Sequence, residues 1–396
     1  MITAAISFVP LAIWAYLLLG RGWFWCCRER DDTAEMSAID ALMQSGSPWP
    51  KIAAVIPARN EAELIAQSLG SLLRQDYPGS FSLVIVDDQS SDNTRAEASS
   101  AALAAGSAER VRILAGGNLP PAWTGKLWAM RQGLSALEAT DEPPEFVLFS
   151  DADIAYAPRT LRHLVAIACS KRTVLTSLMV KLNCESAAEN WLVPAFVFFF
   201  QKLYPFAWVN DVRRATAAAA GGCMLVRRDA LALAGGLEAL RGALIDDCAL
   251  GALMKRQGPI WLGLTEQARS LRRYPALADI RRMVVRSAFA QLRYSPLRLV
   301  CTLVGMITAY VLPPVFTLFA QGPERLAGAL AWILMTLCFV PTLRLYGRPL
   351  LSALALPLIA ALYSVFTMDS ALQHWRGRGG YWKGRFQASL KKAGGP

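Results

Sequence analysis

The chain has 396 residues, of which 54% are hydrophobic, and a formal net charge of +11 at pH 7. The basic residues lie mostly beside hydrophobic segments and no nucleic-acid-binding motif accompanies them, which argues against nucleic acid as a partner and favours an anionic membrane surface. The eight cysteines form no CxxC pair and are interpreted as reduced, structural thiols. His163 and His374 stand in no metal-ligand spacing, so a zinc site is not expected.

Long uncharged stretches lie near both ends of the chain. Residues 1–20 carry no charge and match the roughly 20 apolar residues that cross a bilayer. Because no small-residue cleavage site follows, we interpret this segment as a membrane anchor and not as a signal peptide. The C-terminal region, 291–396, contains three more such stretches, at 299–320, 326–343 and 349–368. The sequence therefore predicts a multi-pass membrane protein.

Basic residues flanking the apolar stretches set the expected orientation. Arginines follow the first stretch and precede the second, so the region between them is expected in the cytoplasm, at a bacterial-type inner membrane. Three further crossings would then place the basic tail outside, against the same rule. Either one late stretch does not cross or the tail breaks the rule. Pro357 interrupts 349–368 and makes that stretch the one suspected of being re-entrant or interfacial.

After a juxtamembrane linker, 21–50, the range 51–290 is long enough for one large domain. Its first half alternates short apolar runs with helical patterns, which is typical of a doubly wound, largely parallel, Rossmann-like α/β sheet. The expected strands are 52–56, 83–86, 111–114 and 146–149, and the expected helices are 61–74, 93–105 and 126–139.

Two of the expected strands end in carboxylates. Asp87 and Asp88 follow one strand, and Asp151 and Asp153 follow another. The carboxyl ends of parallel strands line the crevice where ligands bind in open α/β sheets. Carboxylate oxygens are the ligands that Mg²⁺ or Mn²⁺ prefers, so Asp153, with Asp151, is the candidate metal site. The alternative is that both residues cap a helix at 158–168.

Five motifs follow one another along the chain: Pro57–Glu61, Asp87–Thr94, Gly125–Met130, Asp151–Asp153 and Ile245–Cys248. Their order resembles that of family 2 glycosyltransferases of the GT-A type. Four further segments are Trp123–Lys126, Phe196–Pro205, Gln291–Pro296 and Trp382–Arg385. Within that family they make the chain most similar to the hopene-associated membrane glycosyltransferases.

The resemblance implies a donor site for a nucleoside-diphosphate sugar, UDP-linked, held with a divalent cation. Asp88 is expected to bind the base, Asn60 and Glu61 the base or ribose, and Lys126 the diphosphate, unless it is an ordinary surface lysine. The full set of residues expected at the donor is Pro57, Arg59, Asn60, Glu61, Asp88, Lys126 and Asp151.

The resemblance also implies an inverting transfer with Asp247 as general base, and with Asp246 where the family usually has Glu. Alternatively, these two acids cap the helix that follows. Arg293 is expected to stabilise the leaving group, while Gln291, Tyr294 and Trp382 are expected to contact the acceptor. An ordinary membrane-interface segment explains the 291–294 region equally well.

Residues 191–209 hold a cluster of aromatic side chains interrupted by Pro194 and Pro205. We expect an interfacial amphipathic helix that guides a lipid to the site, with an aromatic core as the alternative. The predicted function is transfer of a sugar to a lipid acceptor, a hopanoid or a polyprenyl lipid. One alternative is a processive polysaccharide synthase, and the length of the product would distinguish it from a lipid glycosyltransferase. A second alternative is a non-catalytic nucleotide-binding scaffold.

Overall fold

The computed structural model describes residues 2–32, 48–383 and 385–386. Parts of the predicted linker (33–47) and of the basic tail (387–396) lie outside the described residues. The chain forms two compact units, each built from separate parts of the sequence. An α/β unit comprises 29–183 and 208–272, and a helical unit comprises 1–28, 184–207 and 273–396. The predicted continuous domain, 51–290, therefore spans parts of both units.

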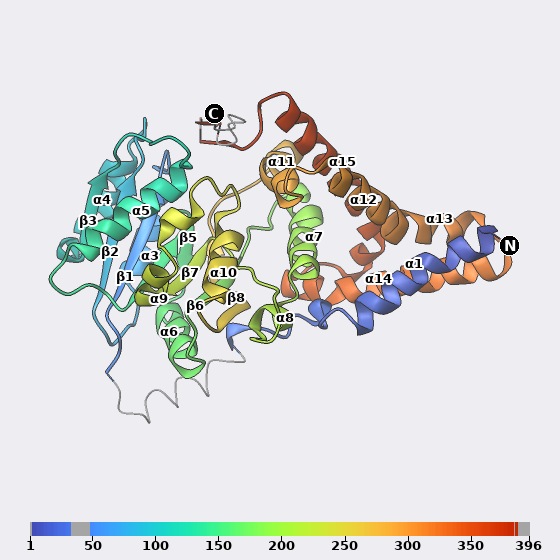
Figure 1. The fold of residues 1–396 in the computed structure, drawn as a ribbon, viewed down its shortest axis with the longest axis horizontal. Helices are drawn as coiled ribbons and strands as arrows, with labels where there is room; N and C mark the ends of the chain where they lie inside the picture. Colours follow the sequence, from blue (N-terminus) through green and yellow to red (C-terminus); the bar gives the residue numbers. More distant parts are fainter. Residues whose placement is uncertain (1, 33–47, 384, 387–396) are drawn as a thin grey trace, which may run out of the picture. The chain divides into compact units, whose positions relative to one another are not determined.

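The α/β unit contains one eight-stranded sheet (Figure 1). Its strand order is β3-β2-β1-β4-β7-β6-β8-β5. The strands are β1 (Ile52–Ala58), β2 (Phe81–Asp87), β3 (Val111–Ala115), β4 (Phe146–Ser150), β5 (Ile154–Tyr156), β6 (Leu175–Lys181), β7 (Cys223–Arg227) and β8 (Ile260–Ser270).

The first half of the sheet is parallel, as predicted, because β1 pairs in parallel with both β2 and β4, and β2 with β3. The second half is mixed. Strand β7 is antiparallel to both β4 and β6, and β5 is antiparallel to β8. The expectation of a largely parallel sheet is thus correct only for the first half. The α/β fold class itself is confirmed.

The helices of this unit cover the sheet. They are α3 (Ile65–Leu73), α4 (Thr94–Ala104), α5 (Gly125–Glu138), α6 (Thr160–Ser170), α9 (Arg228–Leu233) and α10 (Asp246–Lys255), with short 3₁₀ turns η2 (Ala108–Arg110) and η3 (Leu237–Leu240). Helix α5 packs on β1 and β2. A Cβ on Gly133 would lie 2.5 Å from Val55 Cγ1, so glycine is required for this close approach.

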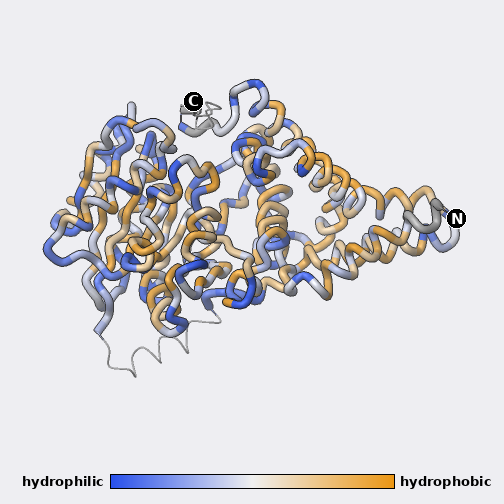
Figure 2. The backbone as a smooth tube through the Cα atoms, in the orientation of Figure 1, coloured by the Kyte–Doolittle hydropathy of each residue, from blue (hydrophilic) through white to orange (hydrophobic). Residues whose placement is uncertain are grey.

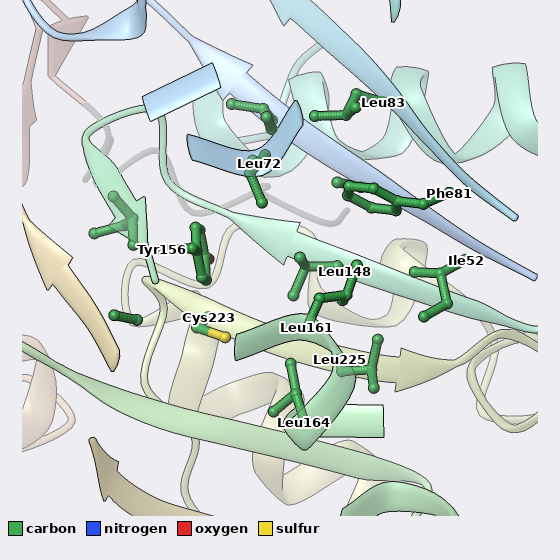
Figure 3. Packing of buried hydrophobic residues seen from close by; sticks show 14 of the residues in the cluster. Ile52, Leu72, Phe81, Leu83, Leu148, Tyr156, Leu161, Leu164, Cys223 and Leu225 are labelled. Atoms are coloured by element: carbon green, nitrogen blue, oxygen red, sulfur yellow. The ribbon is translucent and has the colours of Figure 1, made fainter. Parts of the chain in front are cut away.

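A single apolar cluster joins the sheet to α3 and α6. Strand β1 is buried along its whole length, as expected for a strand covered on both faces. Figure 3 shows Ile52, Phe81 and Leu148 of the sheet together with Leu72 of α3 and Leu161 of α6. Burial of each such side chain contributes about 1.5–3 kcal/mol. This packing holds the strand ends, and hence the loops that follow them, in fixed positions.

The helical unit is predominantly apolar along its helices (Figure 2). Its elements are α1 (Ile2–Leu19), η1 (Phe24–Cys26), α7 (Ala187–Leu203), α11 (Leu277–Gln291), α12 (Pro296–Met306), a π-helical turn η4 (Ile307–Val311), α13 (Leu312–Phe319), α14 (Gly322–Leu345), η5 (Leu350–Ala355), α15 (Leu356–Trp375) and a β9–β10 ribbon (Tyr381–Trp382, Arg385–Phe386). Helix α8 (Phe206–Asn210) spans the point where the chain passes between the units.

Three helical stretches are long and apolar enough to cross a membrane: Pro296–Phe319, Gly322–Leu345 and Leu350–Trp375. They correspond to the three predicted C-terminal segments. Pro357 does not interrupt the last one. It lies in the first turn of α15, where the backbone N–H that proline lacks would have no partner within the helix. In α1 the described apolar helix, Ser7–Leu19, is shorter than these three, so the N-terminal crossing stays a prediction.

Helix α1 is tied to the π-helical turn. A π turn disturbs the regular backbone hydrogen bonds of a helix, and here Trp14 Nε1 donates to the carbonyl oxygen of Ala309 at 2.6 Å. The Trp14 ring meets Tyr310 edge-on, with ring centroids 5.3 Å apart. Trp14 is fully buried. This contact fixes α1 within the helical unit.

The aromatic segment at 191–209 is not one amphipathic helix. Helix α7 ends at Leu203, and the chain turns at Pro205 before α8. Phe198 is fully buried and its ring lies 5.3 Å from that of Phe24 and 5.2 Å from that of Phe339. These side chains form an aromatic core, the alternative to the interfacial surface. The expected role of the segment in guiding a lipid stays a prediction.

Candidate active site

Three loops that carry acidic residues converge on one edge of the α/β unit. Because β1 lies between β2 and β4 and all three are parallel, their carboxyl ends meet at the same edge of the sheet. Glu61 follows β1, Asp88 follows β2, and Asp151 and Asp153 follow β4. The strand register therefore gathers the predicted donor residues at the position where α/β folds bind ligands.

Lys126 connects the β4 loop with the start of α10. It lies in the first turn of α5, whose preceding residue Thr124 caps the helix by accepting a hydrogen bond from the main chain of Leu127. Lys126 Nζ is 2.8 Å from Asp151 Oδ1 and 3.1 Å from Asp246 Oδ2. Burial opposes the charge on the lysine, but the two carboxylates outweigh it and raise the pKa of Lys126. Lys126 is thus the centre of two ion pairs, with its side chain 19% exposed, and not an ordinary surface lysine.

The carboxylates on either side of Lys126 are held differently. Burial raises the pKa of Asp151, and the charge of Asp153 adds to this effect. Asp246 Oδ2 is buried, and although Lys126 Nζ is near, no described group donates a hydrogen bond to it. The ion pair with Lys126 balances its charge, and this oxygen is still able to accept a hydrogen bond from a ligand.

Asp246 and Asp247 form the first turn of α10, where negative charge is favoured by the helix dipole. Neither of them is the N-cap, which is Ile245. Asp247 Oδ1 accepts from the main-chain N–H of Cys248 at 2.7 Å, and Oδ2 accepts from that of Gly221 at 3.0 Å. Burial, together with the charge of Asp246, raises the pKa of Asp247 to about 6.

Gly221 is a site residue that the motifs only hint at. A Cβ at this position would lie 3.2 Å from Lys126 Nζ and 3.3 Å from Asp247 Oδ2. Any larger residue would press on both charged groups. The Gly221-Gly222 pair in the sequence was the available signal, but turns explain such pairs equally well.

Arg272 is the second residue that sequence reasoning missed. It follows β8, and its Nε lies 2.7 Å from Asp153 Oδ2. Its Nη2 lies 2.6 Å and 2.7 Å from the two carboxylate oxygens of Glu61. The only sequence signal was a pair of arginines, Arg272 and Arg273, directly after an apolar strand.

The loops after β1 and β2 are bound to each other. Arg59 Nη1 donates to the carbonyl oxygens of Asp88 and Gln89. Asn60 Oδ1 accepts from the main chain of Ser91 at 2.8 Å. Asp88 is fully buried, with its carboxylate 3.9 Å from Arg59. Pro57 is buried within β1 and precedes the loop.

Asp87 and Asp92 serve the local backbone. Asp87 Oδ1 accepts from the N–H of Ser90 at 3.2 Å. The Asp92 carboxylate accepts from the N–H groups of Thr94 at 3.0 Å and Ala62 at 3.2 Å. These bonds lower the pKa of Asp92, although burial acts in the opposite direction. Both carboxylates therefore bind the backbone of these loops.

Asp151 and Asp153 offer hard oxygen ligands for a divalent cation. They do not cap α6, which begins at Thr160 with Arg159 as its N-cap. Within 7–32, 48–380 and 383, no three His, Cys, Asp or Glu side chains are arranged to hold a metal by themselves. Mg²⁺ typically uses one or two carboxylates and completes its shell with substrate phosphates and water. Two aspartates fit that pattern.

Three of the other predicted residues belong to the helical unit. Gln291 ends α11, and its Nε2 donates to Tyr204 Oη at 2.5 Å. Arg293 and Tyr294 both adopt left-handed backbone conformations, with φ of 53° and 55°. The Tyr294 ring stacks on His374 at 4.3 Å. Two adjacent non-glycine residues at positive φ store strain of the kind found at functional sites.

Trp382 lies in the short strand β9. It pairs with Arg385 in an antiparallel ribbon. The side chain of Trp382 lies outside the described part of the chain, so its expected contact with the acceptor stays a prediction.

One known structure shares this architecture. A mannosyltransferase, PcManGT from Pyrobaculum calidifontis, in complex with GDP-Man and Mn²⁺, superposes with a TM-score of 0.51 at 17% identity, over 95% of this chain and 99% of that one. Mannosyl-3-phosphoglycerate synthase from Rubrobacter xylanophilus has a TM-score of 0.42 at 16% identity, over 69% of this chain and 84% of that one. The first likeness supports a shared fold.

No curated protein matches the sequence. The sequence model of the family described as "Glycosyltransferase like family 2" matches residues 50–262, which include every acidic residue of the candidate site. The chain therefore belongs to the family 2 glycosyltransferases, as the order of its motifs predicts.

Proposed function

We propose that this protein transfers a sugar, with inversion, from a nucleoside-diphosphate sugar to a lipid at the cytoplasmic face of a bacterial-type inner membrane. The observation that carries the proposal is the double ion pair of Lys126. One side chain joins Asp151, in the metal motif, to Asp246, beside the general base. Donor binding and acceptor activation thereby share one buried network.

The donor would lie along the edge formed by the β1, β2 and β4 loops. Asp88 is the acceptor for the base, with Asn60 and Glu61 beside it and Arg59 holding the loop. Lys126 would pair with the diphosphate, which gives this buried cation a further anionic partner. The donor is taken to be UDP-linked by family resemblance. The similar mannosyltransferase holds GDP-Man, so UDP-linked and GDP-linked sugars should both be tested.

Asp153 and Asp151 would hold Mg²⁺ or Mn²⁺. Such a cation neutralises the charge that develops on the departing diphosphate. Mn²⁺ accompanies the donor in the similar mannosyltransferase. Arg293, in the helical unit, is the further cation proposed for the leaving group.

Asp247 is the proposed general base. Two main-chain N–H groups orient its carboxylate, and burial raises its pKa to about 6. A base with a pKa near the working pH is both largely deprotonated and basic enough to accept the proton of an acceptor hydroxyl. Asp246 would assist Asp247 through its own buried carboxylate oxygen, Oδ2.

A lipid acceptor is proposed from the three apolar helices that are long enough to cross a membrane. Resemblance to the hopene-associated group suggests a hopanoid, with a polyprenyl lipid as the other lipid class. Tyr294 and Gln291, at the strained end of α11, and Trp382 are the residues proposed to meet it.

Release of nucleoside diphosphate by the purified, detergent-solubilised protein tests the proposal. UDP- and GDP-sugars would be compared, with Mn²⁺ or EDTA and with or without bacterial lipid extract. We expect release with one donor that requires the metal and is stimulated by lipid. Mass spectrometry of the product should show one added sugar. A ladder of products would instead establish a processive polysaccharide synthase.

A further inference from the structure

The positively charged guanidinium of Arg272 lies beside the carboxylate of Asp153. Asp153 and Glu61 come from different strand ends, and their side chains are only 12% and 10% exposed. Two buried carboxylates side by side require a cation. In this structure Arg272 supplies it, with one nitrogen on Asp153 and another on both oxygens of Glu61.

We propose that Arg272 is a placeholder for the divalent cation, which leaves Asp153 when the cation binds and turns to the diphosphate of the donor. This inference rests on the proposed function, because it takes Asp153 as the metal ligand. It assigns Arg272 a positioning role that the sequence motifs do not suggest.

Electrostatics makes the two occupants exclude each other. The oxygen Oδ2 of Asp153 already binds Arg272 Nε at 2.7 Å, whereas a Mg²⁺–oxygen bond is about 2.0–2.1 Å long. A cation bound to either oxygen of this carboxylate would lie within a few ångströms of the guanidinium. Repulsion between a double and a single positive charge at such a distance disfavours simultaneous binding.

Arg272 has a place to go when the donor arrives. Its side chain is 30% exposed, and both oxygens of Glu61 bind its Nη2. A diphosphate offers paired oxygens that the planar guanidinium can bind in a bidentate manner. Donor and cation should therefore help each other to bind, partly because the donor removes Arg272 from Asp153.

Mn²⁺ binding without any sugar donor tests this directly. The dissociation constant would be measured by electron paramagnetic resonance of free Mn²⁺ with the full-length protein in detergent. Arg272→Gln should bind Mn²⁺ about tenfold more tightly than the wild type, because the competing charge is gone. Arg272→Lys, which keeps a charge, should stay close to the wild type.

Arg273→Gln is the matched control, because this neighbouring side chain is 72% exposed and pairs with Glu185 at the surface. It should leave Mn²⁺ binding unchanged. Arg272→Ala serves as a second neutral variant, and thermal melting verifies that each variant is folded.

Addition of UDP gives the second readout. UDP should tighten Mn²⁺ binding in the wild type by about tenfold more than in Arg272→Gln, since the variant has no placeholder to remove. Equal or weaker Mn²⁺ binding by both neutral variants without UDP would overturn the placeholder and leave the cation site intact. An absence of Mn²⁺ binding in every protein, even with UDP, would overturn the cation site and the placeholder together.

Discussion

Each unit of this protein contains a partly buried lysine, and the two lysines have opposite surroundings. Lys126 in the α/β unit lies between the carboxylates of Asp151 and Asp246, which raise its pKa against the effect of burial. Lys202 on α7 of the helical unit lies 2.8 Å from Tyr310 Oη and over the ring of Phe199. Burial, together with the charge of Arg21, lowers its pKa to about 7.

The difference shows what each unit is built to do. In the α/β unit, charged groups are buried in pairs, and such pairs hold a site ready for anions and cations. In the helical unit, aromatic packing dominates and a buried charge is disfavoured. Substitutions at the paired charges should therefore affect catalysis, and substitutions in the aromatic packing should affect stability.

The largest effect is expected from Asp247→Asn. The amide keeps the size of the side chain but cannot accept a proton, so kcat should fall by about 10² to 10⁴-fold. Release of nucleoside diphosphate measures the loss, and an unchanged melting temperature would show that the fold is intact. Asp229→Asn, at an exposed ion pair with Arg227, is the control and should retain full activity. Full turnover by Asp247→Asn would reject this base.

Phe198→Ala should lower stability by about 3–5 kcal/mol, because it removes a fully buried ring from the aromatic core of the helical unit. Thermal unfolding in detergent provides the measurement. Phe319→Ala removes a ring that is 81% exposed and should change stability little. If the two variants melt alike, Phe198 does not belong to a packed core.

Gly221→Ala should reduce kcat/KM by about tenfold while the protein stays folded, because the added methyl displaces Lys126 and Asp247 by a few tenths of an ångström. The matched control is Gly305→Ala in α12, where an added Cβ meets nothing within 4 Å. A Gly221→Ala enzyme as active as the control would show that the close contact has no role in catalysis.

The pH dependence of kcat/KM should reflect Asp247. Its pKa is raised to about 6, so below this pH the carboxylate is mostly protonated and cannot act as a base. The rate should rise about tenfold for each pH unit up to this value and then level off. A profile that is flat from pH 5 to 7, measured at saturating metal, would contradict the assignment. The residual activity of Asp247→Asn should lack this inflection.

Local patterns were sufficient for the parallel half of the fold. The apolar runs that predict strands 52–56, 83–86 and 146–149 correspond to β1, β2 and β4, because a buried parallel strand needs apolar residues on both faces. The carboxylates after these strands could be placed at one edge of the sheet, because parallel strands have their carboxyl ends on the same side. The three C-terminal helices followed from their length and composition alone.

The order of strands in the second half could not be read from the sequence. β7 is as apolar as β6, yet it runs antiparallel to both of its neighbours. An apolar run specifies burial but not its direction or its partner. The same limit applies to α7, whose aromatic residues suit a core and a membrane interface equally well.

The sequence by itself determined the family, the acidic motifs and their order along the chain, since these depend on residue type and spacing. Only the tertiary structure decided which charges face each other. Lys126 meets Asp246 across 120 residues of sequence, and Arg272 meets Glu61 across 211. Ion pairs act over a few ångströms, so their partners are chosen by how distant segments fold together, which no local pattern records.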